Sequence, residues 1–142
     1  MIMMTYTFPI KKEMAIASTT LSVSPKHALA ICRAINRRTW KDAKMRVDNL
    51  ATQTTPLTGR WKGKYYSKAA SQISKLLDAV ASNARQKTID PETSQLLISA
   101  HRGPSMYRGR RKRRFGMQLK IVHVDAILQK PSERPKKKVE KK

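Results

Sequence analysis

The residues best suited to chemistry in this chain are cations, and they gather in one segment. Between residues 102 and 116, seven of fifteen residues are Lys or Arg and none is acidic. A guanidinium group can donate two parallel hydrogen bonds to phosphate oxygens, and such charge-assisted bonds are stronger than neutral ones. The chemistry predicted for this segment is therefore binding of phosphate groups.

Catalysis and metal binding are poorly supported by the same sequence. The three histidines, His27, His101 and His123, are scattered along the chain, and no His, Cys, Asp or Glu spacing matches a metal site. Partial burial with a hydrogen bond is the simpler interpretation of His101 and His123. We therefore expect no enzyme activity, no metal and no other cofactor.

The charge of the whole chain has the same sign as that segment. Thirty-one Lys and Arg against nine Asp and Glu give a formal net charge of +22, which favours a polyanionic partner. Membrane insertion is not expected, because no apolar run approaches the roughly twenty residues that a spanning helix needs. Cys32 is the only cysteine, which excludes an intramolecular disulfide and fits a cytoplasmic setting. These features favour nucleic acid as the partner.

The first half of the chain predicts one strand and two helices. Residues 13–23 are rich in β-branched residues that partly alternate, as in a half-buried strand. Ser24-Pro25 is typical of a helix start, and Thr39-x-x-Asp42 resembles a capping box that opens a second helix. Their expected apolar faces are Ala28, Ile31, Cys32 and Ile35 in the first helix and Trp40, Ala43, Val47 and Leu50 in the second.

A long helix and a hairpin are predicted in the second half. Helical spacing is strongest between residues 65 and 85, after a loop at 51–64. Two strand-like runs follow at 95–101 and 119–128, and if they pair, the basic segment forms the far end of a long hairpin. The expected buried positions of the long helix are Ala69, Ala70, Ile73, Leu76, Leu77, Val80 and Ala84.

These elements divide the chain into three parts. We expect an N-terminal extension at 1–12, one domain at 13–128 with a hairpin loop at 102–118, and a basic tail at 129–142. The tail is rich in Lys and Pro and cannot bury enough apolar surface to order itself, so we expect it to be disordered without its partner.

Three aromatic residues lie among the cations. Trp61, Tyr107 and Phe115 could stack on unpaired bases, and local packing is the alternative for each. For the basic run itself, the alternatives are a solvated charged loop and a localisation signal. Its position between two patterned strands favours a binding role.

Several motifs, taken in order, resemble the universal large-subunit ribosomal protein family number twenty-two in its archaeal form. The resemblance covers about residues 13–128. It rests on Ser24-Pro25-Lys26-His27-Ala28 with Ile31-Cys32-Arg33-Ala34-Ile35, on residues 76–84, on Ala100-His101-Arg102-Gly103 and on Arg113-Arg114-Phe115-Gly116. The sequence departs from the family pattern in two segments: residues 51–64 are shorter than usual, and the return arm between Gly116 and His123 is some four residues short. In addition, Met117 stands where the family generally has Arg.

The resemblance implies an α/β (α+β) fold in which three helices pack on a small antiparallel sheet with a long protruding β-hairpin. It also implies a structural constituent of the large ribosomal subunit that binds 23S-type rRNA, supports subunit assembly and lines the polypeptide exit tunnel with its hairpin. The implied partners are large-subunit rRNA, neighbouring ribosomal proteins and the nascent polypeptide, all on the cytoplasmic ribosome. A small basic chromatin-type DNA-binding protein is the alternative, and a nuclease or RNA-modifying enzyme is a third class.

The candidate binding residues combine the basic segments with the matched motifs. The hairpin tip should lie near residues 106–112, and the residues expected to face the tunnel are Met106, Tyr107, Arg108, Gly109 and Arg110. The residues expected to contact rRNA are Lys26, His27, Arg60, Trp61, Lys62, Lys64, Lys68, His101, Arg102, Arg108, Arg110, Arg111, Lys112, Arg113, Arg114 and Lys120.

Overall fold

The computed structural model describes residues 9, 11–111 and 113–130. The expected N-terminal extension and basic tail lie mostly outside the described residues, and the candidate residue Lys112 also lies outside them. In chain order, the elements are β1 (Ala15–Leu21), α1 (Pro25–Ile35), α2 (Trp40–Ala51), a short 3-10 helix η1 (Gly59–Trp61), α3 (Ser67–Gln86), β2 (Gln95–Arg102), β3 (Met106–Tyr107), β4 (Gln118–Leu119) and β5 (Val122–Gln129).

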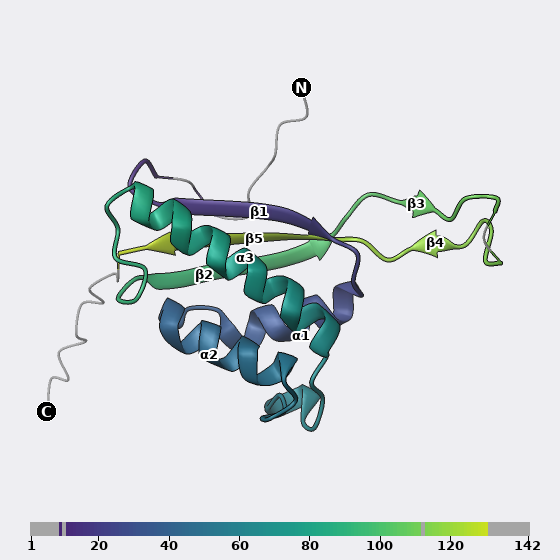
Figure 1. Cartoon of the computed structure of the whole chain (residues 1–142), viewed down its shortest axis with the longest axis horizontal. Coiled ribbons are helices and arrows are strands. Elements are labelled where there is room, and N and C mark those ends of the chain that lie inside the picture. The colour runs from purple at the N-terminus through teal and green to yellow at the C-terminus, as the bar shows by residue number, and fades with distance from the viewer. Residues whose placement is uncertain (1–8, 10, 112, 131–142) are drawn as a thin grey trace, which may run out of the picture.

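The main sheet is antiparallel, with β5 between β1 and β2. Residues opposite each other on paired strands share a face, and Ala15, Leu128 and Leu96 form one such fully buried row. Helix α3 crosses one face of the sheet, while α1 and α2 lie on the β2 side of it (Figure 1). The predicted fold class, three helices on a small antiparallel sheet with a protruding hairpin, is confirmed.

The helix starts agree with the sequence signals. Helix α1 begins at Pro25 after the N-cap Ser24, and the lone Cys32 lies in the core at 2% exposure. At the start of α2, the Thr39 hydroxyl accepts a hydrogen bond from the Asp42 backbone N–H at 3.4 Å. The predicted apolar faces of both helices are buried, except that Trp40 is only half-buried.

Helix α3 fixes the layer above the sheet. All seven apolar positions predicted for it are buried. Its contact with α2 includes a direct hydrogen bond, which the Trp40 indole N–H donates to the Leu77 carbonyl at 3.0 Å. Near the other end of α3, the Asn83 side-chain amide donates to the Ile16 carbonyl of β1 at 2.8 Å. These bonds hold α3 against both α2 and the sheet.

The outer edge of β2 is covered by the segment that follows α1. Arg37 and Leu96 are linked by an N–H to carbonyl bond of 2.8 Å, and the Asn36 side-chain oxygen accepts from the Ile98 N–H at 3.2 Å. Covered edges are protected from pairing with other chains. The segment after α1 therefore closes one edge of the sheet from which the hairpin extends.

The two ladders of the hairpin are separated by a joint, residues 103–105 and 120–121, which corrects the single strand predicted for 119–128. The main ladder ends at the Arg102–Val122 pair, and a second, two-residue ladder resumes at Met106–Leu119. Three residues on the outgoing arm, 103–105, oppose two on the return arm, 120 and 121. Pro104 has no backbone N–H for a ladder, and an unequal count bends paired strands, as a β-bulge does. The predicted return strand is thus divided into β4 and β5.

Candidate RNA-binding surface

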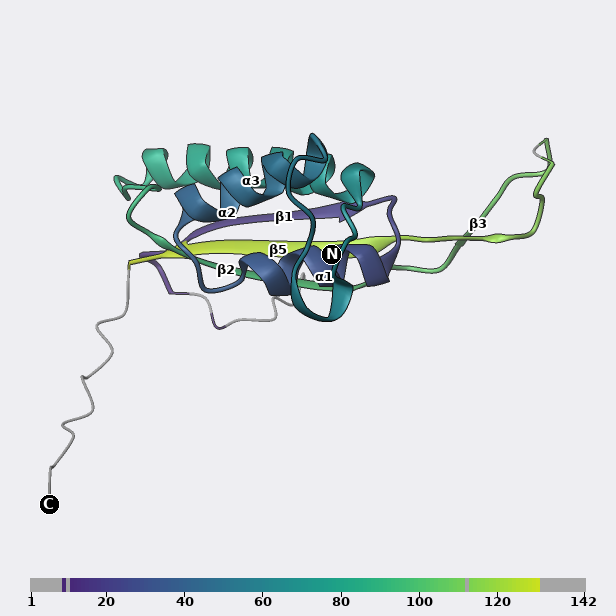
Figure 2. The ribbon, with the colours of Figure 1, turned by 90° about the horizontal axis from the view of Figure 1, so that it is seen from below.

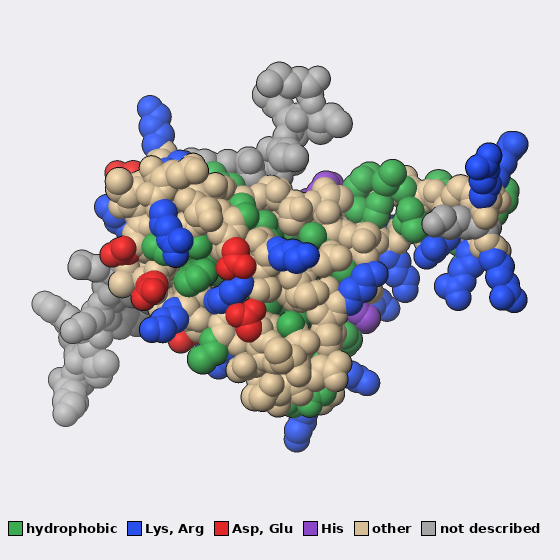
Figure 3. All heavy atoms as spheres, viewed as in Figure 1, with side chains coloured by type: hydrophobic (Ala, Val, Ile, Leu, Met, Phe, Trp, Pro, Cys, Tyr) green, Lys and Arg blue, Asp and Glu red, His purple; other side chains and the backbone are tan. Residues whose placement is uncertain are grey.

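Positive charge dominates one end of the domain and the whole hairpin. Asp42, Asp48 and Asp78 lie on α2 and α3, where Lys44 forms ion pairs with the latter two at 3.7 and 2.8 Å. No residue from 103 to 121 is acidic. Figure 3 shows this division: acidic side chains lie over the body of the domain, whereas the charged side chains drawn in colour at the far end of the hairpin are all Lys or Arg.

Four arginines of the hairpin loop are unengaged by the protein itself. Arg110, Arg111, Arg113 and Arg114 are exposed. Among the described residues, no side-chain hydrogen bond or ion pair involves any of them. Their guanidinium groups are therefore available to an external anion, and their mutual repulsion is left uncompensated.

The far end of the hairpin lies further along the chain than expected. Met106 and Tyr107 belong to the paired arm β3, and pairing continues to Arg108, whose N–H donates to the Met117 carbonyl at 3.0 Å. The terminal loop therefore runs over residues 109–116, and it bends out of the line of the arms (Figure 2). Of the five residues assigned to the tip, Gly109 and Arg110 lie in this loop.

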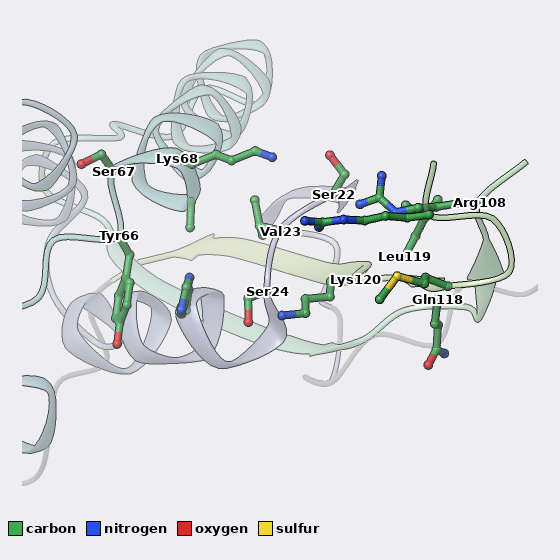
Figure 4. A pocket seen from close by; sticks show the side chains of 14 residues that line it. Ser22, Val23, Ser24, Tyr66, Ser67, Lys68, Arg108, Gln118, Leu119 and Lys120 are labelled. Atoms are coloured by element: carbon green, nitrogen blue, oxygen red, sulfur yellow. The ribbon is translucent and has the colours of Figure 1, made fainter. Parts of the chain in front are cut away.

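A groove lies where the hairpin joins the domain. It has a volume of about 760 Å³ and is walled by the starts of α1 and α3 and by the hairpin (Figure 4). Its lining contains four cations and no carboxylate; the cations are Lys68, Arg108, Arg114 and Lys120. Residues from three separate parts of the sequence thus form one electropositive recess.

A second groove, of about 630 Å³, adjoins the first. It is lined by Lys26 and Arg102, and it shares Lys120 with its neighbour. The Arg102 guanidinium donates to the Gln118 side-chain oxygen at 3.2 Å, and the Gln118 amide donates to Ser105 at 2.9 Å. These bonds tie the two hairpin arms together beside the groove.

The floor of the larger groove contains a stacked ring pair. The rings of His27 and Tyr66 lie 4.0 Å apart with an angle of 15° between their planes. His27 is exposed, but desolvation by neighbouring groups, and secondarily the charge of Lys120, lower its pKa below the ordinary value of 6.5. The His27 imidazole therefore holds a proton less readily than an ordinary histidine does. Tyr66 has a positive φ of 49°, a conformation that a bulky residue rarely adopts.

Sequence reasoning missed Tyr66 as part of the site. It comes 39 positions after His27 and one before α3, so no periodic signal joins the two rings. The available signal was the aromatic pair Tyr65-Tyr66 at the start of the long helix. Gln118, whose bonds brace the arms, carried no signal at all.

The loop between α2 and α3 contributes differently from the prediction. Arg60, Lys62 and Lys64 are exposed on it. Trp61 packs against the core, with the Arg33 guanidinium carbon 5.9 Å from its ring centroid. This contact favours the local packing interpretation for Trp61. Tyr107 and Phe115, in contrast, are 66% and 60% exposed.

His101 lies apart from both grooves. It is opposite His123 in the β2–β5 ladder, with 5.4 Å between ring centroids, and His123 shares a 2.8 Å hydrogen bond with Thr20 of β1. The structure therefore does not bring His101 together with the cations of the groove. Its predicted contact would have to involve a different surface.

Other kinds of site are not apparent in the described part of the chain. Within it, no three His, Cys, Asp or Glu side chains come together as a metal ion requires. No helix there is long and apolar enough to cross a membrane. What the described residues offer is an electropositive surface of the kind that suits phosphate groups. A compact α+β domain with such a surface and an arginine-rich hairpin defines the class of structural RNA-binding proteins.

Comparison with known proteins identifies the family within that class. Residues 16–128 match the family described as ribosomal protein L22p/L17e. The large ribosomal subunit protein uL22 of Methanosphaera stadtmanae is 31% identical, over 87% of this chain and 95% of its own length. The uL22 protein of Methanococcus vannielii is 28% identical, over 78% of this chain and 84% of its own. The chain therefore belongs to the ribosomal protein L22p/L17e family, a family of structural proteins and not of enzymes, as expected.

Proposed function

We propose that this protein is a structural constituent of the large subunit of the cytoplasmic ribosome, where it binds 23S-type rRNA and contacts neighbouring ribosomal proteins. Membership of the L22p/L17e family supports this function. The structural observation that carries it is the acid-free hairpin, whose loop arginines are exposed and have no partner in the described protein. Surrounding phosphates would supply the missing counter-charge.

The hairpin has a second part in the proposal. Its loop, residues 109–116, reaches through rRNA to the wall of the polypeptide exit tunnel and there faces the nascent polypeptide. Met106, Tyr107 and Arg108 line the approach on the paired arm. During assembly, the arginines help distinct rRNA segments to pack against one another, because one projecting arm can contact several segments at once.

Each of the three parts of the chain has its own role in this proposal. Residues 13–128 form the domain that docks on the subunit, the extension at 1–12 precedes it, and the basic tail at 129–142 adds diffuse electrostatic attraction. The candidate contacts fall into two groups, one on the hairpin and one around the starts of α1 and α3.

The alternative, a chromatin-type DNA-binding protein, receives no support from the helices. A helix that enters the major groove presents a face of base-reading and phosphate-binding side chains. The exposed positions of α3 instead mix Lys75 and Arg85 with Asp78 and small residues. Between residues 102 and 120, in contrast, eight of nineteen residues are Lys or Arg and none is acidic.

Sedimentation tests the proposal directly. A tagged copy of the full chain, expressed in an archaeal host, should co-sediment with large subunits on a sucrose gradient and remain there after a moderate-salt wash. Recovery mainly as free protein or on DNA would contradict it. A variant with Arg110, Arg111, Arg113 and Arg114 replaced by Ala should enter subunits poorly, and normal entry would refute the role of the hairpin in assembly.

A further inference from the structure

We propose that the groove at the base of the hairpin holds a single unpaired nucleotide of the rRNA, with its base against the His27–Tyr66 ring pair and its phosphates among the surrounding cations. This inference rests on the proposed function. It adds a specific mode of recognition, in which the protein selects a nucleotide that has left its helix.

The first support is the shape of the groove. Its volume of about 760 Å³ lies within the range of about 300–1,000 Å³ typical of small-ligand pockets. A helical stem is too wide for such a recess, whereas one extruded nucleotide is a ligand of that size. The walls come from α1, α3 and the hairpin, and Figure 4 shows Tyr66 and Lys68 across the groove from Arg108 and Lys120.

The second support is the ring pair. His27 and Tyr66 are nearly parallel, so one face of each ring is used by the other. His27 is exposed, which leaves its remaining surface accessible from the groove that it lines. Every nucleobase has a flat face that stacks on aromatic rings, and RNA-binding proteins commonly recognise unpaired bases in this way.

The third support is the placement of charge around the rings. Lys68 and Lys120 come from the domain end and the return arm, while Arg108 and Arg114 come from the hairpin. Since the lining has no carboxylate, nothing in it repels the phosphates on either side of a bound base. The combination of a stacking face with flanking cations fits a nucleotide better than it fits a free anion.

The test compares two RNA probes that differ by one nucleotide. One is a fully paired duplex, and the other is the same duplex with a single unpaired adenosine bulge. Affinity of the full-length protein for each is measured by fluorescence anisotropy at several salt concentrations. We expect the unmodified protein to bind the bulged probe about tenfold more tightly, as expected for one base stacked on aromatic side chains.

Variants at position 27 separate stacking from charge. His27→Ala should lose the preference for the bulge, and His27→Lys should lose it too while binding both probes more tightly. His27→Phe, which restores an aromatic face, should keep the preference. Tyr65→Leu is the matched control, because Tyr65 adjoins Tyr66 in sequence but does not line the groove. Circular dichroism checks that each variant folds.

The outcomes distinguish this inference from the proposed function. Salt-sensitive binding to both probes without a preference, or a preference that survives His27→Ala, would overturn the nucleotide site and leave rRNA binding intact. Absence of salt-sensitive binding to either probe would contradict the proposed function itself.

Discussion

Neutralising the hairpin loop should weaken rRNA binding in a way that salt reveals. The perturbation is replacement of Arg110, Arg111, Arg113 and Arg114 by Ala, which removes four exposed cations that have no protein partner among the described residues. Each cation that neutralises a phosphate contributes about 0.7–0.9 to the slope of log affinity against log salt. If all four contact rRNA, the slope should decrease by about three units.

The change in slope determines how the affinity difference between the variant and the unmodified protein should change over a practical range of salt concentration. Between about 50 and 200 mM salt, the affinity advantage of the unmodified protein should shrink by about sixtyfold. Filter binding to a large-subunit rRNA transcript measures it. The variant should still fold, because surface substitutions usually change stability by no more than about 0.5 kcal/mol. Relief of the repulsion between the four arginines should, in addition, stabilise the folded protein.

A second quadruple variant provides the control. Replacing Lys41, Arg46, Lys75 and Arg85 by Ala removes the same formal charge from the exposed surfaces of α2 and α3, near the carboxylates. Its slope should change by less than about one unit. An equal loss of slope in both variants would refute the reasoning, because net charge and not the hairpin would then determine binding.

Three further predictions concern the joint, the core and the thiol. Gly103→Ala should change the direction of the hairpin and lower rRNA affinity without unfolding the domain, because an added Cβ would lie 2.7 Å from the Cγ2 atom of Ile121 and 3.2 Å from its carbonyl carbon. Measurements of rRNA affinity and of thermal melting check this prediction. Gly109→Ala is the control, because an added Cβ there would have nothing within 4 Å. Leu77→Ala should cost about 2–5 kcal/mol of unfolding free energy in urea, because Leu77 is fully buried in α3; a loss below about 1 kcal/mol would contradict its place in the core. Cys32 should resist a disulfide exchange reagent at pH 8 until the protein unfolds, because burial raises the pKa of its thiol to about 12. Since that pKa is higher than the ordinary 9.0, the stabilising contribution of the protonated thiol is complete below about pH 9 and declines as the pH rises toward 12, which urea melts at increasing pH would show.

Much of the domain could be predicted because its signals are local. A serine before a proline and a threonine three residues before an aspartate mark helix starts through backbone groups within one turn. The apolar spacing of α3 gives its buried face directly, since 3.6 residues complete each turn. The position of the hairpin followed from two alternating runs with an arginine-rich segment between them.

The groove could not be predicted, because it depends on contacts between distant residues. The stack of His27 on Tyr66 forms with a positive φ at residue 66, and no neighbouring residue type predicts that backbone conformation. The joint was missed because residues 119–128 resemble one alternating run, although two adjacent apolar residues, Ile121 and Val122, interrupt the alternation where the main ladder ends. Trp61 shows the same dependence on distant contacts, since its packing on the domain, one of the two roles considered for it, involves Arg33 of α1.

The side chains of the hairpin indicate which polyanion suits it. Met106, Tyr107, Phe115 and Met117 are all more than half exposed, and they lie on both sides of the cationic run in the sequence. A two-residue ladder such as β3–β4 is too short to hold a stable shape alone. The surface that surrounds it must therefore cover apolar groups as well as neutralise charge. Folded RNA can do both, because its loops present base faces beside phosphates, whereas the outside of a regular duplex presents mainly phosphates.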